Sequence, residues 1–190
     1  IVEYMVDESL KAHLWGTLTE LDREEEEARE QLDLLLGYSD EVPSFSEGET
    51  DALLEAIHTC KILDPACGSG AFPIGMLQKL VYVVHKLDPE NARWKQLQIK
   101  SAENIPDPSA KAAAIKAIER DFEENGDDYG RKLYLIENCL YGVDIPPIAI
   151  QISKLRFFIS LICDQKTNRD KAKNHGIRPL PNLETKFVAA

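Results

Sequence analysis

The stretch Lys61-Ile62-Leu63-Asp64-Pro65-Ala66-Cys67-Gly68-Ser69-Gly70-Ala71-Phe72 decides the fold that we predict for this chain. Its apolar start, at 61–64, predicts a short buried strand that ends in an acid. The Ala-Cys-Gly-Ser-Gly run predicts a tight turn, and the apolar residues from Ala71 onward predict a helix. Because glycine has no Cβ and tolerates positive φ, backbone N–H groups in such a turn can approach a ligand closely. The stretch therefore predicts a ligand-binding strand, turn and helix.

A second unit of the same kind begins at Leu140. The run Leu140–Asp144 predicts a buried strand that ends in an acid, and two prolines then open a strongly apolar helix that reaches Ile162. Residues 187–190 predict a third strand. Strands that alternate with helices predict an α/β fold with a parallel sheet and right-handed crossovers. Asp64 and Asp144 would then both lie at carboxyl ends of strands, where doubly wound sheets bind ligands.

The first part of the chain predicts helices. Apolar residues at helical spacing predict an amphipathic helix over 1–15 that packs on the sheet, and a second, acid-rich helix follows at about 20–36. The run at 24–27 consists of four glutamates, which could form a metal site or bind a basic partner. Such a run is far more typical of a solvated helix face, and we interpret it so. Thr50 or Asp51 is expected to cap a short helix that runs to about His58.

The segment at about 90–130 is polar, locally helical and poor in β-branched residues, so we expect it to be an insertion between core elements. Helices are predicted within it at 109–122 and after it at 132–137, and a loop is predicted at 166–181. We divide the chain into an N-terminal helical segment, 1–58, and a partial domain, 59–190, that contains the insertion.

The composition limits the classes of function. The chain has 190 residues, 44% of them hydrophobic, which is enough for one sizeable core. A formal net charge of −11 argues against a surface that clamps nucleic-acid phosphates.

The cysteines lack paired CxxC spacing, and no run approaches the roughly 18 apolar residues of a membrane span, so we expect reduced thiols in a cytoplasmic protein without zinc. The chain begins within a helical pattern without a starting Met and ends in a strand, so we expect a fragment.

The two acids indicate a nucleoside-containing cofactor. A carboxylate after the second strand can accept hydrogen bonds from a ribose diol, while the first turn holds the part of the ligand nearest the helix. Two simpler roles remain open: Asp64 could cap its own turn, and Asp144 could cap the helix that follows. A dinucleotide site is disfavoured because Pro73 stands where its third glycine would fall, and the string of a phosphate-binding P-loop does not occur.

The sequences of the two strand-and-helix units resemble motifs of a known family. Asp64–Phe72 resembles the first motif of S-adenosylmethionine-dependent DNA adenine-N6 methyltransferases, especially those of type IIG restriction-modification enzymes. Tyr141–Ile145 resembles their second motif. Ile1–Val6 is similar to the segment after their Tyr-Thr-Pro element, and Pro181–Ala190 to the approach to their third motif. The resemblance implies a Rossmann-like methyltransferase fold, of which this chain would carry the half with strands ordered 3-2-1, leaving the strand at 61–64 as an exposed edge prone to self-association.

The resemblance also implies a role for individual residues in binding S-adenosylmethionine. Asp64 would bind the amino group of the methionine moiety, Asp144 the ribose hydroxyls, and Ile145 one face of the adenine. Phe72 would lie near the methionine or the target base, or else be a core aromatic. The turn that wraps the methionine moiety would consist of Pro65, Ala66, Cys67, Gly68, Ser69 and Gly70. Since methyl transfer to an amine needs no covalent thiol, the cysteine is interpreted as a small residue that fits the turn.

The family's catalytic loop, Asp/Asn/Ser-Pro-Pro-Tyr/Phe/Trp, does not occur in this chain. Asp144–Ile148 is only similar to it, because the acid is displaced by one residue and no aromatic follows. We therefore predict the cofactor-binding portion of a DNA adenine-N6 methyltransferase, inactive by itself, with most DNA contacts outside this fragment. The alternatives are a fragment of a protein or RNA methyltransferase, or a non-catalytic domain that retains the fold.

Overall fold

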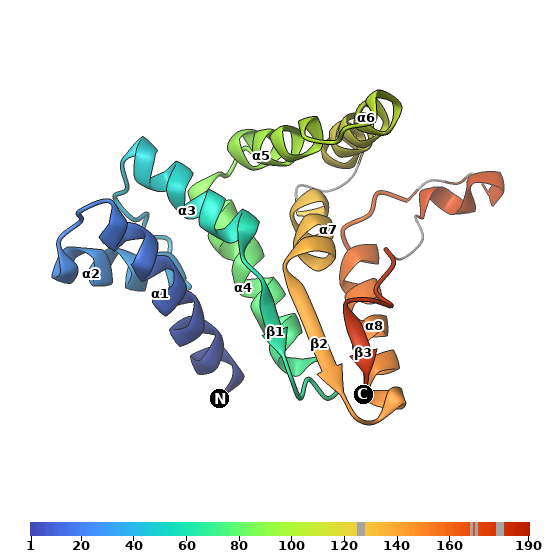
Figure 1. Cartoon of the computed structure of the whole chain (residues 1–190), viewed down its shortest axis with the longest axis horizontal. Coiled ribbons are helices and arrows are strands. Elements are labelled where there is room, and N and C mark those ends of the chain that lie inside the picture. Colours follow the sequence, from blue (N-terminus) through green and yellow to red (C-terminus); the bar gives the residue numbers. More distant parts are fainter. Residues whose placement is uncertain (125–127, 168, 170, 178–180) are drawn as a thin grey trace.

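Three short parallel strands form one sheet in the order β1-β2-β3 (Figure 1). The strand β1 (Ile62–Asp64) pairs with β2 (Leu140–Asp144), which pairs on its other side with β3 (Phe187–Ala189). The computed structural model describes residues 1–124, 128–167, 169, 171–177 and 181–190. The predicted parallel direction and strand order are confirmed, and β1 lies at an edge of the sheet. The chain thus contains part of an α/β fold.

Two long helices cover one face of this sheet. Helix α4 (Ala71–Leu87) connects β1 toward β2, and α8 (Pro147–Ile162) connects β2 toward β3. Because both crossovers run between neighbouring parallel strands in the same direction, the right-handed rule places both helices on the same side, and they contact each other and β2. Side chains that alternate to the opposite face of the sheet remain accessible: Leu63 is 59% exposed and Val188 is 43% exposed.

The N-terminal helices pack beside α4. They are α1 (Val2–Glu20), α2 (Glu25–Leu36) and α3 (Glu47–Thr59). Helix α1 buries Val6, Leu10, Leu14 and Leu18 at helical spacing. We predicted that this face packs on the sheet. The prediction is wrong, because α1 packs chiefly against α2, α3 and α4 rather than on the strands. The acidic residues at 24–27 are exposed, which confirms the solvated helix face.

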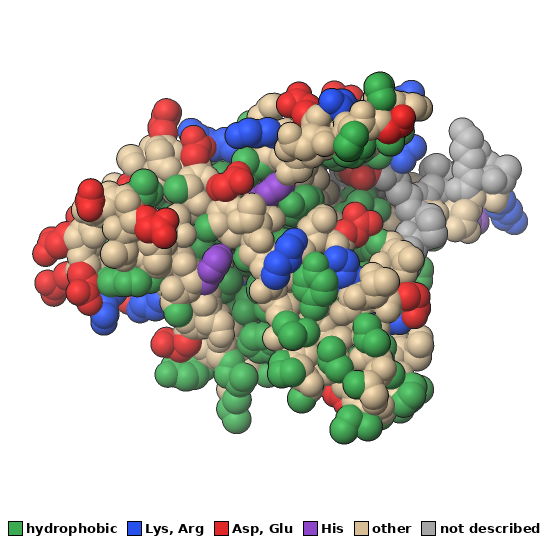
Figure 2. Space-filling model, viewed as in Figure 1, with side chains coloured by type: hydrophobic (Ala, Val, Ile, Leu, Met, Phe, Trp, Pro, Cys, Tyr) green, Lys and Arg blue, Asp and Glu red, His purple; other side chains and the backbone are tan. Residues whose placement is uncertain are grey.

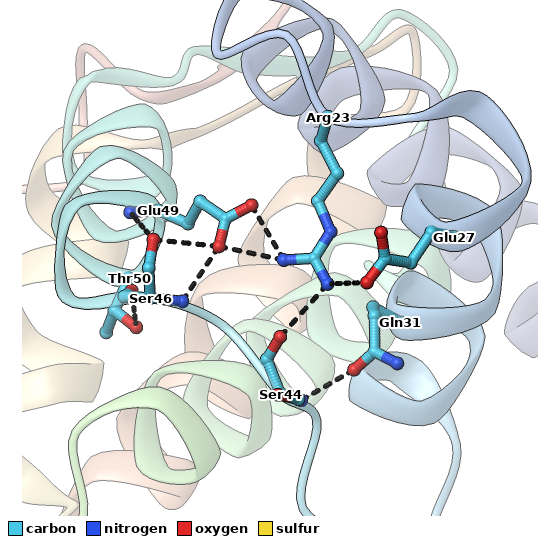
Figure 3. A network of polar contacts seen from close by, with 7 residues as sticks. All are labelled: Arg23, Glu27, Gln31, Ser44, Ser46, Glu49 and Thr50. Carbon is cyan, nitrogen blue, oxygen red and sulfur yellow. Dashed lines mark hydrogen bonds and ion pairs between the residues drawn. The ribbon is translucent and has the colours of Figure 1, made fainter.

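A buried arginine joins the ends of these helices (Figure 3). Arg23, 10% exposed, donates to both carboxylate oxygens of Glu49 at 2.7 and 2.8 Å, and also to Glu27 and to the Ser44 carbonyl. Burial disfavours ionisation of Glu49, but hydrogen bonds from Ser46 and Arg23 outweigh it and hold the pKa of Glu49 below its usual value. The network fixes the loop between α2 and α3.

The cap of α3 differs from the prediction. Ser46, not Thr50 or Asp51, is the N-cap: its hydroxyl accepts from the Glu49 N–H at 3.3 Å, and the Glu49 carboxylate accepts from the Ser46 N–H at 2.7 Å. This reciprocal pair is a capping box, which satisfies two backbone donors at once. The hydroxyl of Thr50 instead donates to the Ser46 carbonyl within the first turn.

The described part of the segment between α4 and β2 consists of helices joined by short turns. It contains α5 (Ala92–Glu103), α6 (Pro108–Glu124) and α7 (Tyr129–Asn138), so both predicted helices are confirmed and a third precedes them. Residues 125–127, in the acidic linker that flanks α6, lie outside the described residues. Part of the loop predicted at 166–181 also lies outside them, and a short 3-10 helix, Lys171–Gly176, falls within the rest.

Aromatic packing attaches the α5–α7 segment to α3. The ring of His58 stacks on Tyr134 at 4.4 Å and meets the edge of Trp94 at 5.7 Å, and Trp94 is fully buried. Burial lowers the pKa of His58, so this histidine is a neutral member of the core. One hydrophobic cluster runs from α1 to β3. None of the described helices combines the length and the apolar character needed to cross a membrane.

Candidate functional site

The turn between β1 and α4 is hydrogen-bonded to the carboxyl end of β2. The Cys67 N–H donates to the Val143 carbonyl at 2.9 Å, and the Gly70 N–H closes the turn by donating to the Cys67 carbonyl at 2.8 Å. Gly68 and Gly70 have φ values of +53° and +82°. Since side-chain-bearing residues rarely adopt these angles, both glycines of the motif are explained by backbone geometry.

Two glycines also permit close approach. A Cβ on Gly70 would collide with the hydroxyl of Ser153 on α8 and lie 3.1 Å from its Cβ. A Cβ on Gly142, in β2, would lie 2.7 Å from the Phe187 ring and 2.9 Å from the sulfur of Cys67. At these two points the turn, β2, β3 and α8 therefore pack too closely to admit an added Cβ.

The structure brings Asp144 to the turn. Its Oδ2 accepts a hydrogen bond from the Gly68 N–H, and its Oδ1 accepts one from the Ile145 N–H at 2.7 Å. Asp144 does not cap α8, whose N-cap is Pro146 without a side-chain bond. The simpler role that we considered for Asp144, a cap of the following helix, is therefore wrong. The hydrogen bond to Gly68 joins two motifs that lie 76 positions apart in the sequence.

Asp64 acts locally. Its Oδ1 accepts from the Ala66 N–H at 3.1 Å, so it caps the beginning of its own turn. Its side chain is half-buried, as is that of Asp144. Besides burial, the charges of both carboxylates raise the pKa of the Cys67 thiol. The site is therefore a glycine turn with one acid at each of two neighbouring strand ends.

Part of this site faces outward. Pro65, Ala66 and Ser69 are exposed, and Ile145 is 78% exposed. Phe72 is partly buried against the core, where it lines a pocket of about 280 Å³ together with Leu10, Ile62 and Met76. The exposed backbone of the turn and the exposed Ile145 are thus accessible to a ligand, while Phe72 has the surroundings of a core aromatic.

Cys67 has the surroundings of a packing residue. It is 5% exposed, and burial, together with the charges of Asp64 and Asp144, raises the pKa of its thiol. A thiol with a raised pKa is a weak nucleophile at neutral pH because it is protonated. The environment supports the interpretation of Cys67 as a small residue that fits the turn.

Three residues near the turn were missed by the sequence analysis. Gly142 lies within the second motif, Tyr141–Ile145, but was given no role, and Ser153 and Arg156 were not predicted to take part. Arg156 donates from Nη1 to the Ser69 carbonyl at 3.1 Å, and Ser153 lies against Gly70. A sequence signal existed for both: they are polar residues on a helix whose other residues are mostly apolar.

Larger cavities lie elsewhere. A groove of about 720 Å³ between α3 and α5 is crossed by an ion pair of Arg93 and Asp51, with 2.5 Å between Nη1 and Oδ1. It lacks a glycine turn and strand ends, so its size alone does not make it the better candidate site. Within the part of the chain that the structure describes, no group of three or more His, Cys, Asp or Glu side chains is arranged to hold a metal ion.

Comparison with known proteins gives one informative match. A protein of Methanocaldococcus jannaschii, provisionally named a type II restriction enzyme and methyltransferase, is 37% identical to this chain over 134 residues. The chain resembles part of that protein. The match covers 70% of this chain but only 8% of the relative, so the chain spans a small part of the relative's length. No family model and no solved structure matches the chain.

Proposed function

We propose that this chain is the S-adenosylmethionine-binding portion of a restriction-modification methyltransferase that acts on the N6 amine of adenine in DNA. The observation that carries the proposal is the contact between the Gly68 N–H and the Asp144 carboxylate. It joins a glycine turn and a strand-end acid at the carboxyl ends of two paired parallel strands, where folds of this class bind ligands. The M. jannaschii relative supports the same class of protein.

The residues present fit this cofactor. Asp144 uses its oxygens for two backbone donors, and a carboxylate can accept about four hydrogen bonds, which leaves acceptor capacity for two ribose hydroxyls. Ile145 offers an exposed apolar side chain beside it for one face of an adenine. Gly68 has no Cβ, and an added Cβ there would meet only the Asp144 carboxylate, at 3.9 Å, so a methionine moiety can lie close to the backbone at this position.

In this proposal the chain's residues bind and orient. Residues Pro65 to Gly70 wrap the methionine moiety, Asp64 accepts a hydrogen bond from its amino group, and Asp144 orients the ribose. Bound S-adenosylmethionine supplies the methyl group. Phe72 is assigned to the core side of the turn, because it packs beside Leu10 and Met76. We further assign residues 59–190 to a partial Rossmann-like methyltransferase domain and 1–58 to its helical N-terminal segment.

The target amine must be held by other residues. The 190 residues contain no Asp/Asn/Ser-Pro-Pro-aromatic loop of the kind that accepts a flipped adenine, and the net charge of −11 does not suit a phosphate backbone. We therefore place the catalytic loop and most DNA contacts outside this chain. The chain by itself is expected to bind the cofactor without transferring methyl groups.

Calorimetry with S-adenosylmethionine tests the proposal. We expect the unchanged chain to bind it, and Asp144→Ala to raise the dissociation constant about tenfold or more, because a charged acceptor for the ribose is lost. Asp40→Ala is a matched control, since Asp40 is an exposed loop residue, and it should bind normally. ATP and NAD should not compete. Equal affinity of the unchanged chain and Asp144→Ala would remove Asp144 from its role.

The substrate class needs a separate experiment. A protein that contains this chain together with a catalytic loop should methylate adenine in duplex DNA, measured as N6-methyladenine after digestion. Label on RNA or on a protein side chain would instead favour another methyltransferase class. A folded chain that binds no S-adenosylmethionine at millimolar concentration would contradict the proposal and favour a non-catalytic domain.

A further inference from the structure

Helix α8 contacts the glycine turn with two polar side chains. Arg156, half-buried, donates from Nη1 to the Ser69 carbonyl at 3.1 Å. Ser153 is fully buried, and its hydroxyl has no hydrogen-bond partner among the described residues. It lies against Gly70 so closely that no Cβ fits between them. These contacts connect the helix of the second strand unit to the turn of the first.

The contacts determine the orientation of the peptide groups in the turn. The Cys67–Gly68 peptide is fixed by the bond from the Gly68 N–H to Asp144. The Ser69–Gly70 peptide is fixed at both ends, because its carbonyl accepts from Arg156 and its N–H donates to the Cys67 carbonyl. Between them, the Ser69 N–H has no hydrogen-bond partner among the described residues. A donor held between two fixed peptides is preorganised for a ligand acceptor.

Ser153 acts through its size, which determines how close Gly70 can lie to α8. An unpaired buried hydroxyl lowers stability, so the small size of Ser153 explains its position better than its polarity does. Gly70 at φ +82° precedes α4 directly, and a larger side chain at position 153 would push it away. Such a push would move the Ser69 N–H together with the first N–H groups of α4.

We propose that Arg156 and Ser153 are positioning residues of the cofactor turn: Arg156 orients the Ser69 peptide, and Ser153 sets the depth at which Gly70 sits on α8. This proposal rests on the proposed function for its ligand, S-adenosylmethionine. It goes beyond that function because it assigns the geometry of the turn to two side chains of α8, to which the proposed function gives no cofactor contact.

Arginine variants test the first role. We expect Arg156→Ala to raise the dissociation constant for S-adenosylmethionine about tenfold, with little change in the unfolding midpoint. Arg156→Lys should recover most of the affinity, because an ammonium group can also donate to the Ser69 carbonyl. The control is Arg29→Ala, which removes the same charge from a 60% exposed position on α2 (Figure 1). Affinity close to normal in Arg156→Ala would overturn the role, as would equal loss in the alanine and lysine variants.

Serine variants test the second role. Ser153→Ala should bind S-adenosylmethionine within about twofold of the unchanged chain, whereas Ser153→Val should weaken binding several-fold because its extra methyl group meets Gly70. The opposite ranking would mean that the hydroxyl, not the size, matters.

Amide spectra separate this proposal from the proposed function. Without cofactor, Arg156→Ala should shift the ¹⁵N–¹H signals of Gly68, Ser69 and Gly70, and Arg29→Ala should leave them unchanged. Unmoved turn signals would overturn the positioning role even if the unchanged chain binds S-adenosylmethionine. Shifted signals in a chain that binds no S-adenosylmethionine would instead retain the positioning role and reject the proposed ligand.

Discussion

The two strand-to-helix junctions of the sheet use different chemistry, although each follows a parallel strand that ends in aspartate. Between β1 and α4, two glycines with positive φ expose backbone N–H groups. Between β2 and α8, Pro146 and Pro147 provide no N–H at all, and the junction contributes the carboxylate of Asp144. One junction therefore supplies donors and the other supplies an acceptor. The bond from the Gly68 N–H to Asp144 makes them one site.

The largest effect is expected where the glycine junction touches α8. Gly70→Ala forces a Cβ onto a residue at φ +82° and against Ser153, so we expect a loss of about 3 kcal/mol or more in the free energy of unfolding. Urea denaturation measures it. Gly16→Ala is the matched control: Gly16 lies within α1 with nothing within 4 Å of an added Cβ, and alanine there should stabilise by up to about 1 kcal/mol. Equal behaviour of the two variants would mean that the first junction does not depend on glycine.

The next largest effect is expected where β2 supports the glycine junction. Gly142→Ala places a Cβ 2.7 Å from the Phe187 ring and 2.9 Å from the Cys67 sulfur, and we expect a loss of about 2 kcal/mol in the free energy of unfolding. Gly48→Ala, near the start of α3, adds a Cβ in open space and should change stability little. A Gly142→Ala variant within 0.5 kcal/mol of the unchanged chain, about the range of neutral surface substitutions, would show that the contact is easily relieved.

The sequence predicted the junctions better than the contacts between them. Glycine and proline act on their own backbone, so the turn, the strands and the order of the elements followed from local patterns. The capping box was also local, and Ser46 with Glu49 three positions later was a readable signal that the choice of Thr50 or Asp51 overlooked. Arg156 and Ser153 stood out as polar residues on an apolar helix, but their contact with the turn could not be assigned, because it spans more than 80 positions of the chain. Only the packed structure supplies such pairs.

The acids of the two junctions should differ in their contribution to stability. Asp144→Ala removes the acceptor of two backbone donors, one of them on the partly buried Gly68, and we expect a loss of about 1–2 kcal/mol in the free energy of unfolding. Asp64→Ala removes only a bond to the exposed Ala66 N–H, which water can replace, so we expect less than about 0.5 kcal/mol. Thermal unfolding of both variants side by side measures the difference. If Asp64→Ala were the more damaging change, the coupling of the junctions through Asp144 would not be the dominant contact.

The strands that feed the two junctions also differ in their neighbours. Among the described residues, β2 is paired on both sides and β1 is paired with β2 alone, so amide and carbonyl groups around the 59% exposed Leu63 face the free edge. On the side of the molecule that Figure 2 shows, hydrophobic side chains gather over the strands and over α8 beside them. We expect the chain to self-associate through this edge, and Leu63→Lys to restore a monomer while changing the free energy of unfolding by less than about 0.5 kcal/mol. Sedimentation velocity over a range of concentrations measures this. Val42→Lys is the control because Val42 is 77% exposed in the loop between α2 and α3 and belongs to no strand, so it should not change association. If the unchanged chain were a monomer at all concentrations, the short β1 edge would not pair with a second copy of the chain. The two junctions would then differ only in the groups that they offer to a ligand.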